Sequence, residues 1–149
     1  MTDAFVAYVH YLGIMILMAA LVTEHALLGG KLDLRRAKQM ATTDLIYGAA
    51  AAAVLLSGIV RMLYLGKGSA FYFSNPLFHA KLTLFVVLAL ISVYPSVQIA
   101  GWRMGIKQGH APPALPNRVA VMRWIIRIEL TALALIPLLA VLMGRGFGY

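Results

Sequence analysis

The stretch "NPLFHAKLTLFVVLALISVYP" (residues 75–95) decides how this chain folds. After Pro76, which marks a helix end, it is almost entirely apolar over about 20 residues, the length that a helix needs to cross the hydrocarbon of a bilayer. The stretch therefore predicts a membrane-spanning helix. Two residues that a bilayer disfavours, His79 and Lys81, lie just inside its start.

The composition of the whole chain agrees with a membrane location. Of the 149 residues, 62% are hydrophobic and only 12% are charged, so the chain lacks the charged surface of a soluble domain. It contains no cysteine, which excludes disulfides, iron–sulfur clusters and thiolate metal sites. The net charge is +8, but the basic residues lie mostly in short loops. Membrane topology explains them better than nucleic-acid binding does.

Four apolar stretches are each close to the length of a span, and we place them at residues 4–28, 43–65, 76–100 and 120–143. Short connections that contain Gly or Pro join them. Short connections make consecutive helices antiparallel neighbours. The sequence therefore predicts an all-α integral membrane protein, a single up-down four-helix bundle that includes residues 1–149.

The basic residues predict the orientation of this bundle. We call the membrane side that holds both termini side A, and the opposite side side B. Nine basic residues fall on side B, namely Lys31, Arg35, Arg36, Lys38, Arg103, Lys107, Arg118, Arg123 and Arg127. Four fall on side A, namely Arg61, Lys67, Lys81 and Arg145. The positive-inside rule makes side B cytoplasmic, so we expect a multi-pass protein of the bacterial inner membrane with both termini periplasmic. The N-terminus lacks a basic region and a cleavage site, so we expect the first span to be retained.

Two histidines lie at similar depths below side A. His10 is about 9 Å inside the first span and His79 about 5 Å inside the third, at about 1.5 Å per residue. These two spans are diagonal in an up-down bundle, so imidazoles that face inward from them fit the two axial positions of a haem iron. The alternative is that each histidine is an interfacial or hydrogen-bonded residue.

Two basic residues accompany the histidines on side A. Lys81 follows His79 by two positions and so points about 200° away around the helix. Lys81 and Arg61 are candidates to bind an acidic group such as a haem propionate, or else they extend toward the headgroups. The candidate cofactor site thus consists of His10, His79, Lys81 and Arg61, with His10 and His79 as the metal ligands.

A second polar cluster is expected near side B. It contains Glu24, His25 and Glu129, together with Arg123 or Arg127. Glu129 is about nine residues inside the fourth span, where a carboxyl group needs a partner or a proton. We expect a structural ion pair here and keep a proton path as the alternative.

Most of the chain also resembles known membrane families. The stretches "VHYLGIMILMAAL" (9–21) and "FHAKLTLFVVLAL" (78–90) resemble the first and third spans of the HemJ-type protoporphyrinogen oxidases, whose third span opens with His-x-Lys-Leu. "LRRAKQMATTDLIYG" (34–48) is similar to the basic loop of those proteins. The same four-span pattern recurs in CopD-like copper-resistance domains and in a family of predicted bacterial membrane proteins, to which we expect this chain to belong. The resemblance implies haem b, with His10 and His79 as axial ligands.

Three functions follow as hypotheses. The first is a b-type haem protein that transfers electrons, with quinone as one acceptor. The second is a HemJ-like oxidase that acts on a porphyrin precursor. The third is a CopD-like copper-handling or non-catalytic bundle, in which Met62 would join His79 or His10 as a ligand, because copper(I) favours methionine and histidine. In each case the bilayer is a partner, and a homo-oligomer or a partner subunit is compatible with the sequence.

Overall fold

The computed structural model describes residues 1–65, 73–113 and 115–146, and these residues form a bundle of long helices. Helix α1 covers Thr2–Leu27 and α2 covers Leu34–Val60. A short π-helix, η1 (Arg61–Leu65), continues α2. Helix α4 covers Pro76–Lys107 and α5 covers Pro116–Gly144. The predicted all-α four-helix architecture is confirmed, and all four long helices have the length and hydropathy of membrane spans.

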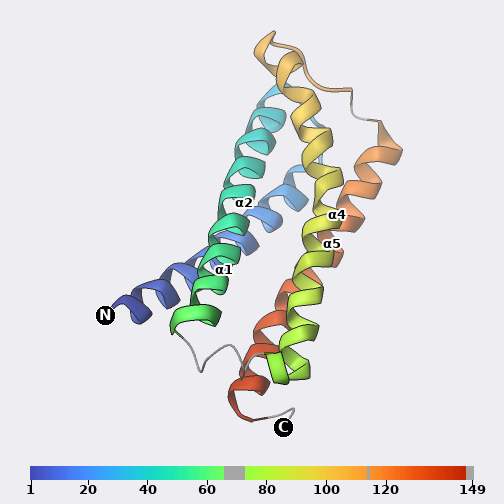
Figure 1. Ribbon diagram of the computed structural model, residues 1–149. Helices are drawn as coiled ribbons and strands as arrows, with labels where there is room; N and C mark the ends of the chain where they lie inside the picture. The colour runs from blue at the N-terminus through green and yellow to red at the C-terminus, as the bar shows by residue number, and fades with distance from the viewer. Residues whose placement is uncertain (66–72, 114, 147–149) are drawn as a thin grey trace.

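The four helices form a ring in which each packs against two others. Helix α1 contacts α2 and α5, and α4 contacts the same two helices, so α1 and α4 are diagonal, as are α2 and α5. Figure 1 shows α1 crossing the bundle at a steep tilt to the other helices. In the same view α1 begins and α5 ends at the same end of the bundle, which is the end we call side A (Figure 1).

The helices extend beyond the predicted spans at side B. Helix α2 begins at Leu34 instead of residue 43, because Asp33 accepts a hydrogen bond from the backbone N–H of Arg36 at 2.8 Å and so caps the helix. Helix α4 continues to Lys107 instead of ending near residue 100. The basic segments that the sequence assigns to connections are therefore partly helical. Lys67, which was expected on side A, lies outside the described residues.

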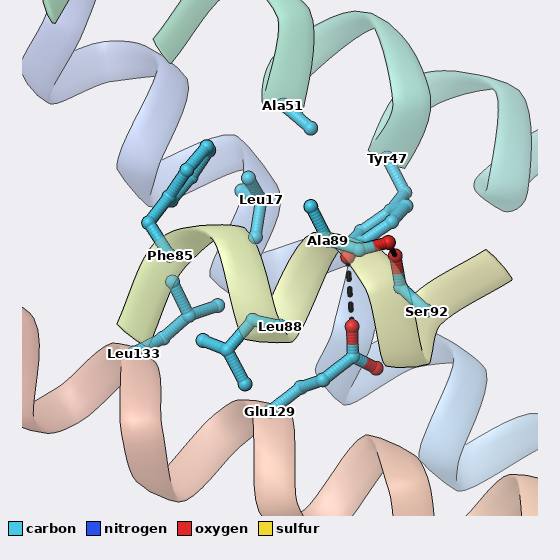
Figure 2. A pocket seen from close by; sticks show the side chains of 9 residues that line it. All are labelled: Leu17, Tyr47, Ala51, Phe85, Leu88, Ala89, Ser92, Glu129 and Leu133. Carbon is cyan, nitrogen blue, oxygen red and sulfur yellow. Dashed lines mark hydrogen bonds between the residues drawn. The ribbon is translucent and has the colours of Figure 1, made fainter. Parts of the chain in front are cut away.

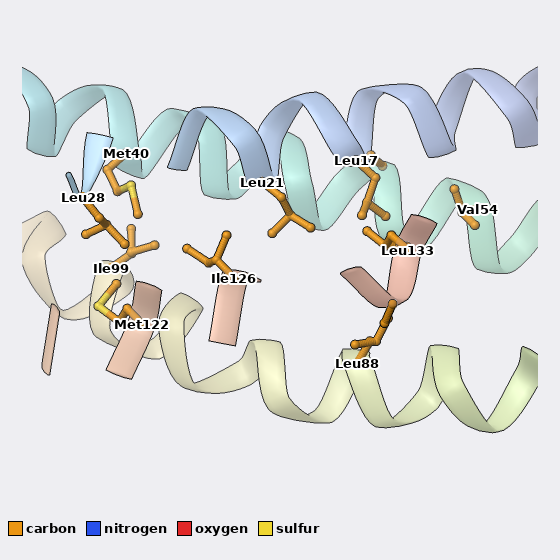
Figure 3. Packing of buried hydrophobic residues seen from close by; sticks show 12 residues of the cluster. Leu17, Leu21, Leu28, Met40, Val54, Leu88, Ile99, Met122, Ile126 and Leu133 are labelled. Carbon is orange, nitrogen blue, oxygen red and sulfur yellow. The ribbon is translucent and has the colours of Figure 1, made fainter. Parts of the chain in front are cut away.

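The core is built from one narrow stripe on each helix. On α1 the stripe contains the buried residues Leu17 and Leu21 and continues to Leu28 just after the helix, and on α5 it contains Ile126 and Leu133. Spacings of three and four residues put such side chains on one helix face. Figure 3 shows these side chains meeting those of α2 and α4 along the axis of the bundle.

The outer surface of the bundle is strongly apolar. Large hydrophobic side chains are widely exposed on all four helices, for example Val22 at 55%, Leu56 at 63%, Leu90 at 67% and Leu138 at 53%. A soluble monomer rarely exposes apolar patches of this extent. Lipid acyl chains solvate such a surface, so the fold is that of a membrane-embedded bundle.

Candidate functional site

His10 faces the neighbouring helix α2. Its Nδ1 lies 3.0 Å from the carbonyl oxygen of Val54 and 3.0 Å from the hydroxyl oxygen of Ser57. A carbonyl only accepts, so Nδ1 carries the hydrogen and donates it, which leaves a lone pair on Nε2. The ring packs against Gly58, where an added Cβ would lie 3.2 Å from the Cε1 of His10. The imidazole is thus held in a fixed orientation with one free nitrogen.

Two cations lie near His10 on side A. Arg61 is the first residue of η1, and its guanidinium carbon lies 5.4 Å from the centre of the Tyr11 ring. The Nζ of Lys81 on α4 lies 5.6 Å from the centre of the Phe78 ring. Both cations interact electrostatically with His10, and they interact with each other. We call His10, Arg61 and Lys81 the side A basic cluster.

The side A basic cluster contains no carboxylate. Within residues 1–65, 73–113 and 115–146, the ion pair that the structure shows is between Arg103 and Asp44, near side B. The sequence places Asp3 as the acidic residue of the side A region, and it lies seven residues, or about 10 Å along α1, from His10. The Arg61 and Lys81 cations, from η1 and α4, therefore act on the His10 imidazole with no carboxylate inside the cluster to offset their charge.

His79 is placed differently from the other three predicted site residues. Its side chain is exposed, and its Nε2 lies 2.8 Å from the carbonyl oxygen of Phe73. This bond makes Nε2 the donor, so the lone pair is on Nδ1. The structure thus brings His10, Arg61 and Lys81 together and turns His79 toward the segment that precedes its own helix.

A second polar region lies deeper in the bundle. The hydroxyl of Tyr47 on α2 donates to Oε1 of Glu129 on α5 at 2.8 Å. Tyr47 and Glu129 line a small cavity, together with Ser92 of α4 (Figure 2). The cavity has a volume of about 50 Å³, and its remaining lining is apolar and includes Leu17 and Phe85.

Two further carboxyl groups lie on the side B half of this region. Asp44 accepts a hydrogen bond from the Ser96 hydroxyl at 2.6 Å, and its Oδ2 is 3.6 Å from a terminal guanidinium nitrogen of Arg103. Glu24 is only 2% exposed, and no described residue forms a hydrogen bond with its Oε1. Glu24 interacts electrostatically with Asp44 and Glu129, so the three carboxyl groups form one cluster.

The predicted ion pair in this region is wrong. Arg127 donates through Nε to the Nε2 of His25 at 3.1 Å, while Glu129 binds Tyr47. Arg127 precedes Glu129 by two positions, so the two side chains point about 200° apart around α5. Glu129 therefore faces the core, while Arg127 lies on the outer surface beside the Trp124 ring.

The sequence interpretation missed Asp44 and Tyr47. Both belong to the inward stripe of α2, which also contains Met40, Val54 and Ser57. The helical spacing of α2 could have identified both residues. A polar residue that falls three or four positions from the apolar residues of an inward-facing stripe also faces the core. On α1 and α5 the same spacing places Glu24 between Leu21 and Leu28, and Glu129 between Ile126 and Leu133.

No group of three or more His, Asp or Glu side chains in the described part of the chain is arranged to hold a metal ion. A metal bound by protein side chains alone would need additional ligands.

These features define a class of protein, a multi-pass membrane protein made of a four-helix bundle with ionisable groups in its interior. The chain matches the model of the family described as predicted membrane protein (DUF2214) over residues 2–148, and it belongs to that family. Membership of a family of predicted membrane proteins is thereby confirmed. No curated protein and no solved structure matches the chain, so the resemblance to HemJ-type and CopD-like proteins stays a prediction.

Proposed function

We propose that this chain is a b-type haem protein of the bacterial inner membrane that binds one haem on side A and takes part in electron transfer. In this proposal His10 and His79 would hold the haem iron. Arg61 and Lys81 bind the propionate groups. The observation that carries the proposal is the convergence of His10, Arg61 and Lys81 from α1, η1 and α4.

The orientation of His10 supports its role as a ligand. Histidines that ligate a metal almost always donate their other ring N–H to a carbonyl, a carboxylate or water, which fixes the tautomer. His10 makes such a bond through Nδ1 to Val54, and this leaves Nε2 available. A histidine that only joined α1 to α2 would make the same bond. The visible absorption spectrum of the purified protein distinguishes these two roles.

The charge of the side A basic cluster supports the role of Arg61 and Lys81. Cations inside a membrane are expensive unless they pair with an anion or reach the headgroups. A haem propionate would supply the negative charge that the described residues near Arg61 and Lys81 lack.

His79 is less ready than His10 to bind the haem iron. Its Nε2 donates to Phe73, so this nitrogen becomes available to iron only when that hydrogen bond opens. That hydrogen bond joins His79 to the segment just before α4. A haem with two imidazole ligands would supply reversible one-electron transfer to an acceptor such as a quinone.

The test is the visible absorption spectrum of protein purified from haem-replete cells. We expect a six-coordinate low-spin haem in the wild type, loss of the haem in His10→Ala, and a changed coordination state in His79→Ala. The chain contains four histidines, so His25→Ala and His110→Ala are matched controls that keep the wild-type spectrum. A colourless wild-type preparation contradicts the proposal.

The same purified protein also tests the other two hypotheses, the HemJ-like oxidase and the CopD-like copper protein. Oxidation of protoporphyrinogen by the haem-loaded protein would identify a HemJ-like oxidase, in which Arg61 and Lys81 bind the carboxylates of the porphyrin substrate. Copper in place of iron in a metal analysis would identify a CopD-like protein.

A further inference from the structure

We propose that Glu24 and Glu129, with Tyr47 between them, form a proton-exchange site inside the membrane that receives its protons from side B through Asp44. This inference does not rest on the haem proposal, because it concerns different residues in a different part of the bundle.

Glu24 is the first observation that points to a bound proton. It is 2% exposed, and its Oε1 has no hydrogen-bond partner among the residues that the structure describes. The groups that face it are Asp44 and Tyr47 from α2 and Glu129 from α5, and none of these is a cation. An ionised carboxylate that is buried without a partner is strongly destabilised, and two neighbouring carboxyl groups make it less stable still. Glu24 therefore holds a proton.

The surroundings of Glu129 are the second observation that points to a bound proton. It is 1% exposed and accepts its hydrogen bond from a neutral hydroxyl, that of Tyr47. The cavity beside this bond measures about 50 Å³ and is lined by Tyr47, Ser92 and Glu129 among apolar residues. A water molecule takes up about 30 Å³ in the liquid and needs two to four polar partners. The cavity has both the space and the partners, so a proton on Glu129 can be exchanged with water there.

Asp44 connects this site to side B. It is 8% exposed, and its carboxylate is bound by Ser96 and by Arg103, whose side chain is 40% exposed. Among the described residues, Asp44 is the one of the three clustered carboxyl groups that is paired with a cation. The Arg103 guanidinium stabilises the carboxylate form of Asp44, which is the form that can accept a proton from side B. Asp44 also acts electrostatically on Glu24, so the two carboxyl groups belong to the same region of the interior.

Each transfer along this path breaks one O–H bond and forms another. Hydronium on side B gives its proton to the Asp44 carboxylate and becomes water, and Asp44 becomes a neutral acid. Asp44 returns to the carboxylate when Glu24 accepts that proton on Oε1 and releases its own from the other oxygen toward Tyr47. The Tyr47 hydroxyl accepts this proton while passing its original one to Oε1 of Glu129. Glu129 gives up the proton on its other oxygen to the cavity water in the same step, so it never holds two protons. The hydronium formed there returns its excess proton to side B by the reverse of these steps, which leaves every side chain in its starting state with exchanged protons.

The composition of the chain allows a test without any substitution. Glu24 and Glu129 are its two glutamates. Wild-type protein with ¹³C at the glutamate side-chain carboxyl, reconstituted in lipid vesicles, is examined by infrared spectroscopy at neutral pH. We expect a carbonyl band of a protonated carboxylic acid that shifts on ¹³C labelling and shifts again in D₂O. If labelling moves only the bands of ionised carboxylates, the proposal is overturned.

Variants then assign the band and the route. Glu24→Gln and Glu129→Gln, which keep the size of the side chain, should each remove one component of the band. Asp44→Asn should leave both components in place and slow their deuteration at least several-fold. Asp33→Asn, at an exposed position on side B, is the matched control and should behave as wild type. Deuteration as fast in Asp44→Asn as in wild type would overturn the route through Asp44.

Discussion

Tyr47 and Glu129 are joined by a 2.8 Å hydrogen bond although their helices, α2 and α5, are diagonal in the bundle and do not pack against each other. The bond therefore spans the interior and connects two sides of the ring. The bond lies in the membrane interior, out of reach of bulk water, so its loss leaves a buried oxygen without its protein partner. This hydrogen bond links α2 to α5 and lies at the centre of the proposed proton-exchange site.

Removing the hydroxyl in Tyr47→Phe should destabilise the bundle. The change leaves Glu129 without its donor, and an unsatisfied buried polar group costs about 1–3 kcal/mol. Unfolding in mixed detergent, followed by circular dichroism, measures the loss. Tyr64→Phe is the matched control, since Tyr64 is 79% exposed, and it should change the free energy of unfolding by less than about 0.5 kcal/mol. Equal stabilities of the two variants would contradict a structural role for the bond.

Enlarging Gly13 should separate α1 from α2. A Cβ added at Gly13 would lie 2.8 Å from Cγ2 of Val54, closer than such contacts normally are. We expect Gly13→Ala to destabilise the protein by about 1–3 kcal/mol through overpacking. Combining it with Val54→Ala should recover part of this loss, because the two substitutions share one contact. Gly48→Ala, where nothing lies within 4 Å, should be close to neutral in the same unfolding assay.

Enlarging Gly58 should disturb His10 without removing it. A Cβ there would lie 3.2 Å from Cε1 of His10, so the ring must move by a few tenths of an ångström. If His10 ligates haem, as we propose, Gly58→Ala should retain the haem but shift its absorption bands or its midpoint potential. Gly48→Ala again serves as the control on the same helix. A haem spectrum and potential identical to those of wild type would show that the His10 ring is not a ligand in this orientation.

The predicted orientation can be tested by labelling, because the chain contains no cysteine of its own. Asp3→Cys lies on side A, and Lys107→Cys lies at the side B end of α4. With side B cytoplasmic, a membrane-impermeant maleimide added to spheroplasts should label the first variant and spare the second. Inverted vesicles should give the opposite result. The reverse pattern would place both termini in the cytoplasm and move the candidate haem site to that side.

The sequence predicted the number and type of the helices well. Each of the four apolar stretches has the length of a span, and hydrophobic length is a local property that needs no tertiary contact. The helix ends at side B were predicted less well, because α2 begins at an Asp33 cap and continues through a basic, interfacial segment. Hydropathy indicates where a helix enters the membrane, but it does not indicate where the helix begins.

The candidate sites were predictable only in part. The sequence identified His10, Arg61 and Lys81 as buried or interfacial polar residues, and the tertiary structure brings them together. It also identified Glu24 and Glu129 but assigned them the wrong partners, since Arg127 is close to Glu129 in sequence and points away from it in space.

What the sequence determined by itself was the class of the protein, through composition, span length and the distribution of basic residues. Partners across the bundle, such as Tyr47 with Glu129 and His10 with Val54, were decided only by the tertiary structure. The physical reason is that a bilayer selects each helix by its own hydrophobicity. The tilt and rotation of the helices come from side-chain packing between them, and no single stretch of sequence contains that information.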